Sequence, residues 1–228
     1  MDNALINSYH ILLNNIKNVC TELNKPLPLL LAVSKTHQID KIIDIYNQGQ
    51  RDFGENYVQE LISKATQLSN LAIKWHYIGH IQSNKIKSIA QYASYVHGLS
   101  NINHAIKLNN YCQYFNRQIK VLIEVNITNK DSRNGLINFQ DVLTLANQIN
   151  KLTHIQLIGI MGIASNVDDE AIINRDFAEL NQIFTKLKQH NLQINTLSIG
   201  MSKDYIIAIK NNSNLIRIGS HIFGNRQV

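Results

Sequence analysis

The sequence predicts an α/β fold, a single closed (β/α)8 TIM barrel with an extra N-terminal helix, and three observations support it. Short apolar runs of strand character alternate with longer segments of helical period along the chain. Such alternation is typical of parallel strands joined by helical crossovers. Eight strand-like runs are present, and this number favours a closed barrel over an open sheet. The third observation is an amphipathic segment ahead of the first strand.

The strand-like runs are rich in Ile, Val, Leu and aromatic residues. We expect strands at about residues 28–34, 51–54, 74–79, 95–98, 120–127, 155–162, 196–200 and 215–218. The helical segments between them cover residues 38–49, 56–68, 84–93, 101–115, 138–152, 168–190 and 203–211. Each helical segment thus joins two consecutive strands, as a parallel barrel requires.

The N-terminal segment, residues 3–23, is expected to form a helix that completes the outer ring. The chain stops about ten residues after the last predicted strand, which leaves no room there for an eighth outer helix. No linker rich in Pro, Gly or Ser divides the sequence. Residues 1–228 are therefore expected to form one domain.

The composition is that of a folded globular protein, with 44% hydrophobic and 17% charged residues. A formal charge of +6 is compatible with a nucleic-acid partner, but the Lys and Arg residues are scattered and form no basic run. A solvated basic surface, which also suits anionic small molecules, explains this charge better. We expect no nucleic-acid partner.

The cysteines and the N-terminus predict a cytoplasmic protein. Cys20 and Cys112 form no CxxC pair, which favours buried thiols in a reducing compartment over a disulfide. The first segment has an acid at position 2 and many Asn residues, unlike a signal peptide. No apolar run approaches the ~18 residues of a membrane span, so no membrane association is expected.

Glycine and polar residues gather at the predicted C-terminal ends of the strands, where barrels of this kind place their sites. Gly200-Met201-Ser202 follows the seventh strand, and Gly219-Ser220 follows the eighth. Glycines that allow close approach, backbone N–H groups and hydroxyl donors suit a phosphate monoester. An ordinary turn or cap explains each motif alone, but their joint placement favours a phosphate site at Ser202, Gly219 and Ser220.

Lys35 lies directly after the first predicted strand, in Ser34-Lys35-Thr36, and two interpretations stay open. Its stem can lie along the barrel rim with the ammonium group in water. Alternatively, the amine sits in a desolvated mouth, where its pKa falls and it can form a Schiff base with a carbonyl. A phosphate site across the mouth favours the second interpretation. An aldehyde phosphate such as pyridoxal 5'-phosphate (PLP) would then place its carbonyl near the lysine.

Arg217 lies in the apolar strand LIRIG, and strand alternation places it on the opposite face from Ile216 and Ile218. An inward arginine stays protonated, so beside a pyridine ring it can only donate to the ring nitrogen. The nitrogen then stays unprotonated, and the cofactor is a poor electron sink. Such a site favours holding the cofactor, or mild racemase-like chemistry, over transamination.

Other polar residues have structural explanations. His76 and His80 would lie about 13 Å apart on one strand, so a metal pair is not expected and no metal site is predicted. Residues 168–170, Asp-Asp-Glu, are typical of the first turn of a helix. Glu55 and Glu124 have no obvious acid partner, and Glu124 needs an Arg or Lys from a neighbouring strand if it is buried.

Five sequence blocks resemble the YggS/PROSC family of pyridoxal phosphate homeostasis proteins, in order and over almost the whole chain. They are AVSKT (32–36), FGENYVQE (53–60), WHYIGHIQSNK (75–85), LSIGMSKDYIIAI (197–209) and IRIGSHIFGNR (216–226). The resemblance implies a barrel like the N-terminal domain of alanine racemase, with PLP bound as a Schiff base. It also implies a role in balancing PLP and related amino-acid and keto-acid pools, without established turnover.

The resemblance also implies roles for individual residues. Lys35 resembles the Schiff-base lysine, Asn56 the residue near the cofactor ring, and Arg217 the partner of the ring nitrogen. The phosphate cradle is implied at Ser202, Gly219 and Ser220.

Two positions depart from the family pattern. Ser220 stands where many relatives carry Thr, and it keeps the hydroxyl donor. Arg133, in NKDSRNG, stands where relatives often carry a lysine. Because an arginine cannot form a second imine, the sequence does not support a cofactor-transfer role for that loop.

The leading hypothesis is a protein that binds and buffers PLP, with PLP-dependent apoenzymes as candidate acceptors. The alternative is an amino-acid racemase or a related enzyme. Two-base racemisation needs a second acid/base, which alanine racemases supply from an additional C-terminal domain, and this sequence ends at Val228 directly after the barrel. Tyr57 or a histidine at the mouth could still support slow activity. Without a dimerising domain, a monomer is the expected state.

Overall fold

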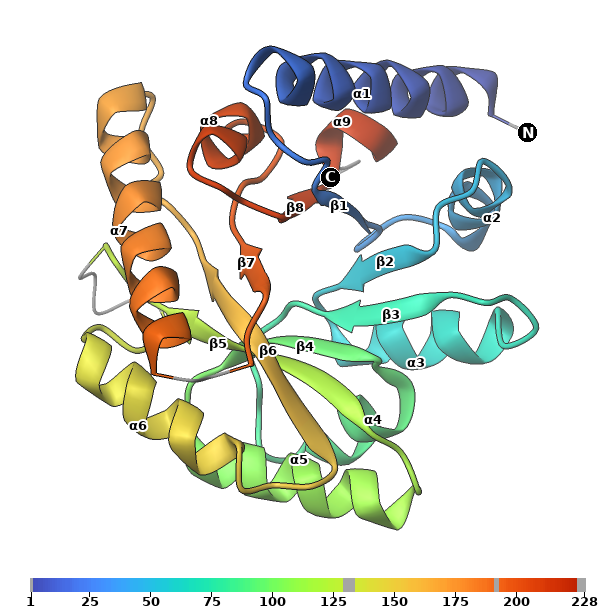
Figure 1. Cartoon of the computed structure of the whole chain (residues 1–228). Coiled ribbons are helices and arrows are strands. Elements are labelled where there is room, and N and C mark those ends of the chain that lie inside the picture. Colours follow the sequence, from blue (N-terminus) through green and yellow to red (C-terminus); the bar gives the residue numbers. More distant parts are fainter. Residues whose placement is uncertain (1, 129–133, 191–192, 225–228) are drawn as a thin grey trace.

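The computed structural model describes residues 2–128, 134–190 and 193–224, and its strands close into a parallel barrel in the order β1 to β8 (Figure 1). The strands are β1 (Leu29–Val33), β2 (Asp52–Glu55), β3 (Lys74–Tyr77), β4 (Tyr95–Leu99), β5 (Ile119–Val125), β6 (Ile155–Gly162), β7 (Thr196–Ser198) and β8 (Leu215–Ile218). The ring closes where β8 pairs in parallel with β1. The predicted α/β barrel is confirmed.

Helices surround the barrel, as Figure 1 shows. They are α1 (Asn3–Glu22), α2 (Ile39–Asn47), α3 (Val58–Gln67), α4 (Ile86–Tyr92), α5 (Ile102–Tyr114), α6 (Phe139–Ile149), α7 (Glu170–Gln189), α8 (Tyr205–Lys210) and α9 (Ser220–Phe223). Helices α2 to α8 each connect two consecutive strands. Each of the predicted helical segments is therefore present.

The N-terminal helix occupies the gap in the outer ring, as predicted. Its buried residues recur at helical spacing on one face, namely Leu5, Tyr9, Leu12, Ile16 and Cys20. This helix, α1, lies beside the short α9 that follows the last strand and also contacts α2 (Figure 1). The apolar stripe thus covers the side of the barrel that α9 is too short to cover.

Four strands end one or two residues before the predicted boundary, namely β1, β3, β5 and β7. A glycine explains the early ends of β3 and β7. β3 ends at Tyr77 instead of Gly79, because the chain turns where Gly79 approaches the backbone of Asn56. A Cβ atom at Gly79 would lie 2.1 Å from the Asn56 carbonyl oxygen. β7 ends at Ser198 instead of Gly200, whose φ of +94° belongs to the left-handed region that favours glycine.

The apolar core lies mainly between the barrel and its helices. Strand residues such as Ala32, Phe53 and Val96 are fully buried in one cluster with the helix residues Leu61 and Ile89. A second, small apolar cluster is formed by Leu122, Ile158 and Met161. The barrel interior also contains buried polar side chains, among them His76, His97 and Arg217.

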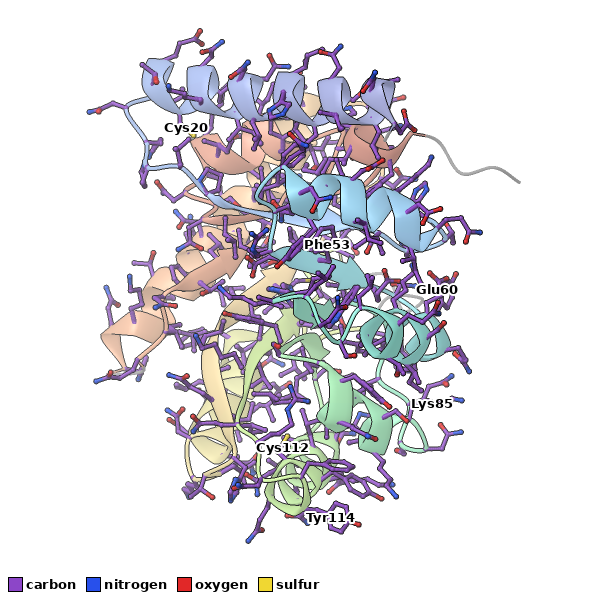
Figure 2. All side chains as sticks on the ribbon, turned by 90° about the vertical axis from the view of Figure 1, so that its right-hand side faces the viewer. Cys20, Phe53, Glu60, Lys85, Cys112 and Tyr114 are labelled. Atoms are coloured by element: carbon purple, nitrogen blue, oxygen red, sulfur yellow. The ribbon has the colours of Figure 1, made fainter. Side chains whose placement is uncertain are left out.

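The two cysteines are buried and free, as expected. Cys20 on α1 and Cys112 on α5 lie at opposite ends of the molecule (Figure 2). Burial raises the pKa of the Cys112 thiol to about 11, so it is not a reactive thiolate at neutral pH. Within the described residues, no helix combines the length and the apolar character needed to cross a membrane.

Candidate functional site

A cavity of about 450 Å³ opens at the C-terminal ends of the strands, within the ~300–1,000 Å³ typical of small-molecule sites. Its lining comes from β1 and β8 and from the segments that follow β1, β3, β7 and β8. The lining residues are Val33, Lys35, His37, Ile78, Met201, Arg217, Gly219, Ser220 and Gly224. The fold therefore brings together four of the residues that the sequence singles out, Lys35, Arg217, Gly219 and Ser220.

The two other predicted site residues lie beside this cavity. Ser202 lines an adjoining cavity of about 370 Å³, and Met201 lines both. Asn56 follows β2 and is half-buried, but it is not among the described residues that line either of these two cavities. Roles of Ser202 and Asn56 in ligand binding stay predictions.

Lys35 is placed by a tight turn after β1. Val33 and Lys35 both line the cavity, as residues two apart along a strand direction share a face. Ser34 lies between them and is fully buried. The following Thr36 has a φ of +66°, which is unusual for a β-branched residue. The Lys35 side chain is partly exposed, less buried than a fully desolvated mouth would require.

Four polar side chains gather outside the barrel wall, next to this turn, and we call them the outer cluster. They are Ser34, Glu55, Glu60 and Lys64. Lys64 Nζ, on α3, donates to Glu55 Oε1 at 2.9 Å and to Glu60 Oε2 at 2.7 Å. Ser34 Oγ donates to Glu55 Oε1 at 2.5 Å. Figure 2 shows Glu60 near the start of α3. Glu55 therefore has a basic partner, which its sequence context does not reveal.

Burial acts differently on the two carboxyl groups of the outer cluster. Burial raises the pKa of Glu55 to about 7, although Lys64 and Ser34 lower it. Burial also raises the pKa of Glu60, but hydrogen bonds from Lys64 and from the Thr36 N–H outweigh it, so the net shift is downward. Only the i,i+4 spacing of Glu60 and Lys64 signals this cluster in the sequence.

Arg217 lies on β8, the strand that pairs with β1 in the ring, and neutral oxygens hold its guanidinium group. Its Nη1 donates to the Ser198 carbonyl at 2.6 Å and to Ser198 Oγ at 2.7 Å, and its Nη2 donates to the Gly162 carbonyl at 3.0 Å. These bonds use three of the five guanidinium N–H groups. For the other two, the described residues provide no acceptor. Burial lowers the pKa of Arg217 to about 10, so it stays cationic at neutral pH.

A series of hydrogen bonds, which we call the inner chain, continues from Arg217 across the barrel interior. Ser198 Oγ lies 3.4 Å from His97 Nδ1, His97 Nε2 lies 2.9 Å from His76 Nδ1, and His76 Nε2 lies 2.9 Å from Asp52 Oδ1. Arg217 can only donate to Ser198 Oγ. We therefore assign the Ser198 hydroxyl as the donor of the hydrogen bond to His97 Nδ1. His97 then donates to His76, and His76 donates to Asp52.

Both histidines of the inner chain are fully buried. Burial lowers the pKa of His97 well below its usual value, and the nearby His76 and Arg217 lower it further. Burial also lowers the pKa of His76, while Asp52 raises it. Neutral histidines match the hydrogen-bond assignment, in which each ring donates once and accepts once. The sequence does not predict this chain, because its members come from β2, β3, β4 and β7.

The remaining residues discussed from the sequence lie apart from the cavity. His76 bonds to Asp52 and His97 and does not pair with His80, which is exposed. Among the described residues no group of three or more His, Cys, Asp or Glu side chains is arranged to hold a metal ion. Tyr57 is 49% exposed and does not belong to the described cavity lining.

The remaining acidic residues from the sequence analysis are residues 168–170 and Glu124. Asp169 caps α7 by accepting hydrogen bonds from the backbone of Ala171 and Ile172. Glu124 is only partly buried, and no Lys or Arg nitrogen of the described residues lies within 4 Å of it. Burial raises its pKa, and Arg217 acts on it from a longer distance. Arg133 lies outside the described residues.

The chain has close relatives among curated proteins. It is 38% identical over 218 residues to the pyridoxal phosphate homeostasis protein of Pasteurella multocida, covering 93% of each sequence. It is 38% identical over 223 residues to the protein of the same name from Haemophilus influenzae, covering 95% of this chain and 94% of that protein. Residues 8–227 also match the family model of the alanine racemase N-terminal domain.

Solved structures show the same architecture. PipY of Synechococcus elongatus is 30% identical, with TM-scores of 0.83 without PLP and 0.80 with PLP bound, over 92% of this chain and 100% of PipY. An alanine racemase of Clostridium difficile has a TM-score of 0.79 at 15% identity, over 97% of this chain and 58% of the racemase, which shows the fold alone. The chain belongs to the family of pyridoxal phosphate homeostasis proteins, within the alanine racemase N-terminal domain family.

Proposed function

We propose that this protein binds PLP at the barrel mouth, as a Schiff base on Lys35, and takes part in PLP homeostasis. One observation carries the proposal: a single cavity of about 450 Å³ is lined by Lys35, Arg217, Gly219 and Ser220. The names of the relatives and the PLP-bound structure of PipY support the same ligand.

The chemistry of Lys35 fits an aldehyde ligand. Its amine, when unprotonated, would add to the aldehyde carbon, and the carbonyl oxygen would leave as water. Val33 and Ile78 line the cavity beside it and provide an apolar surface for an aromatic ring. When bound, PLP supplies a conjugated ring that can accept electrons from carbon atoms attached to its imine.

The β7–β8 side of the cavity, which adjoins β1, fits the ring nitrogen and the phosphate. Arg217 has two N–H groups beyond those bound to protein oxygens, and as a cation it can only donate. It would keep the ring nitrogen unprotonated, which limits the electron-accepting power of the ring. Gly219, Ser220 and the neighbouring Ser202 would hold the phosphate, and Asn56 would lie near the ring.

The site supports storage of the cofactor more than turnover. A Schiff base on Lys35 would keep a reactive aldehyde bound until an apoenzyme accepts it, and amino-acid and keto-acid pools would respond indirectly. Slow racemisation is the second candidate function, because His37 lines the same cavity and stacks on Phe223 with ring centroids 5.0 Å apart. A histidine at that place could act as a second acid/base.

The decisive experiment loads the purified protein with PLP and treats it with borohydride. The wild type should show a visible absorption band that borohydride removes, and Lys35 should then carry the mass of a pyridoxyl phosphate group. Lys35→Ala should show neither. The matched control is Lys41→Ala on α2, which should behave as the wild type. A wild type without a reducible adduct, or an adduct that persists in Lys35→Ala, would refute the proposal.

A second measurement separates storage from catalysis. The loaded protein is incubated with D- and L-alanine, and the chirality of the amino acid is followed against free PLP. Racemisation no faster than with free PLP supports storage. Turnover well above free PLP that is lost in His37→Asn would favour the racemase alternative instead.

A further inference from the structure

The turn that carries Lys35 is fixed on both sides by the outer cluster. Before Lys35, the Ser34 hydroxyl donates to Glu55 Oε1 at 2.5 Å. After Lys35, the Thr36 N–H donates to Glu60 Oε2 at 2.7 Å. Glu55 and Glu60 both belong to the FGENYVQE segment at β2 and α3. This segment therefore contacts the two residues that flank Lys35.

Lys64 joins these two attachments. Its side chain is 7% exposed, and all three ammonium N–H groups are used. They donate to the Ser34 carbonyl at 2.8 Å, to Glu55 Oε1 at 2.9 Å and to Glu60 Oε2 at 2.7 Å. One cation thus connects the carbonyl before Lys35 to the carboxylate that binds the N–H group after it.

The backbone of the turn needs such support. Thr36 adopts a φ of +66°, where the Cβ branch of a threonine is crowded. A strained conformation of this kind persists only when its surroundings determine it, and such sites are often functional. The hydrogen bond from the Thr36 N–H to Glu60 is a contact that holds this conformation directly.

The outer cluster is poorly explained by stability alone. Glu55 is fully buried, and its Oε2 atom has no hydrogen-bond partner in the described structure. A buried ion cluster is weak evidence for stability, since well-packed apolar residues often do as well or better. The polar contacts of this cluster instead converge on the Ser34–Thr36 turn.

We propose that Glu55, Glu60 and Lys64 are positioning residues for Lys35, which hold its turn so that the amine faces the cavity. The inference rests on the proposed function, in which the Lys35 amine meets an aldehyde there. Preorganisation of this kind acts on rate, because a displacement of about 1 Å can slow a reaction by ~10²-fold.

The test compares Glu60→Ala with Glu60→Gln. Glutamine keeps a side-chain oxygen that can accept from the Thr36 N–H and from Lys64, whereas alanine removes it. Glu179→Ala, at an exposed position of α7, is the matched control. Two readouts are used: the rate of PLP binding, and the pH profile of Lys35 acetylation by trace acetic anhydride without PLP, quantified by mass spectrometry.

We expect Glu60→Ala to slow PLP binding by roughly 10- to 100-fold and to shift the acetylation profile of Lys35. Glu60→Gln should stay within a few-fold of the wild type, and Glu179→Ala should equal it. Lys64→Met should have the same effect as Glu60→Ala. If Lys64→Met does not fold, the comparison of Glu60→Ala with Glu60→Gln tests the inference. Unchanged rate and profile in a folded Glu60→Ala would overturn the inference.

The two proposals fail in distinguishable ways. If the wild type forms no adduct with PLP, the proposed function fails, while the acetylation profile still reports on the position of the Lys35 amine. If the wild type forms the adduct and Glu60→Ala forms it equally fast with the same acetylation profile, only the positioning role fails.

Discussion

The two walls of the barrel mouth hold their basic residues in opposite ways. On the β1–β2 wall, the buried cation Lys64 is shared by two carboxylates, Glu55 and Glu60. On the β7–β8 wall, Arg217 contacts only carbonyl and hydroxyl oxygens among the described residues. The compensated cation supports the backbone that carries Lys35. Arg217 forms no salt bridge within the described residues, although the charges of Asp204 and Glu124 act on it from a longer distance. It lines the cavity, where its remaining N–H groups can serve a ligand.

The outer cluster and the inner chain also contain buried groups with opposite pH dependences. In the outer cluster, the pKa of Glu55 is raised, so the folded protein binds a proton there more tightly than the unfolded chain. In the inner chain, the pKa values of His76 and His97 are lowered, so the folded protein resists protonation. The stability that Glu55 contributes is therefore lost as the pH rises, and the stability that the inner chain contributes is lost as the pH falls. Glu60, whose pKa is lowered, has the same sign as the inner chain.

The largest effect is expected from breaking the compensation in the outer cluster with Lys64→Met. At pH 8, this change should lower the free energy of unfolding by about 3–5 kcal/mol, because it leaves the Glu55 carboxylate buried without a counter-ion. Urea denaturation measures it. At pH 6 the loss should be smaller, since Glu55 can then take up a proton.

The control for this prediction is Lys186→Met, which removes an exposed lysine from α7. Its effect should stay within about 0.5 kcal/mol, as for most surface changes. If Lys64→Met costs no more than the control at pH 8, the ion cluster does not hold the turn, and the contrast between the two walls disappears.

Glu55→Gln should isolate the pH dependence of the outer cluster. Burial, partly offset by Lys64 and Ser34, shifts the pKa of Glu55 from 4.5 to about 7 in the folded protein. Its protonation therefore adds stability that is fully present below pH 4.5 and is lost as the pH rises through 7. The difference in unfolding free energy between wild type and variant should fall by roughly 3 kcal/mol across this window.

The measurement is urea denaturation of both proteins at matched pH values. Taking the difference removes the contribution of the histidines, which has the opposite sign and is common to both proteins. The variant should therefore still lose stability below about pH 6.5, as the buried neutral histidines of the inner chain resist protonation. A constant difference over the whole range would mean that the pKa of Glu55 is not raised in the folded protein.

The sequence predicts the barrel well because its signals are local. Alternating strand and helix runs place all eight strands to within two residues. The early ends of β3 and β7 reflect the close backbone approach of Gly79 and the positive φ of Gly200, which no sequence pattern shows. The inward direction of Arg217 also follows from simple alternation. It is confirmed by its bonds across to β6 and β7.

The supporting networks could not be predicted in the same way. Asp52, His76, His97 and Ser198 come from four strands, and only the closed ring brings β4 and β7 together across the interior. Glu55 appears unpaired in the sequence because its partner Lys64 reaches it from the next helix. The FGENYVQE block is distinctive as a motif, but its contacts with the Lys35 turn are visible only in three dimensions.

The smallest effect is expected at the far end of the inner chain, with Asp52→Asn. The amide oxygen can still accept from His76 but carries no charge, so the unfolding free energy should fall by about 1.5 kcal/mol, the low end for a bond to a charged group. Because Asp52 raises the pKa of His76 against the effect of burial, an NMR titration should find that pKa lowered further. Asp168→Asn, at an exposed position, is the control.

The same variant should change PLP binding little. Three hydrogen bonds separate Asp52 from Ser198, and Arg217 keeps its backbone acceptors. A large loss of PLP affinity would instead mean that the inner chain positions Arg217, as the outer cluster is inferred to position Lys35.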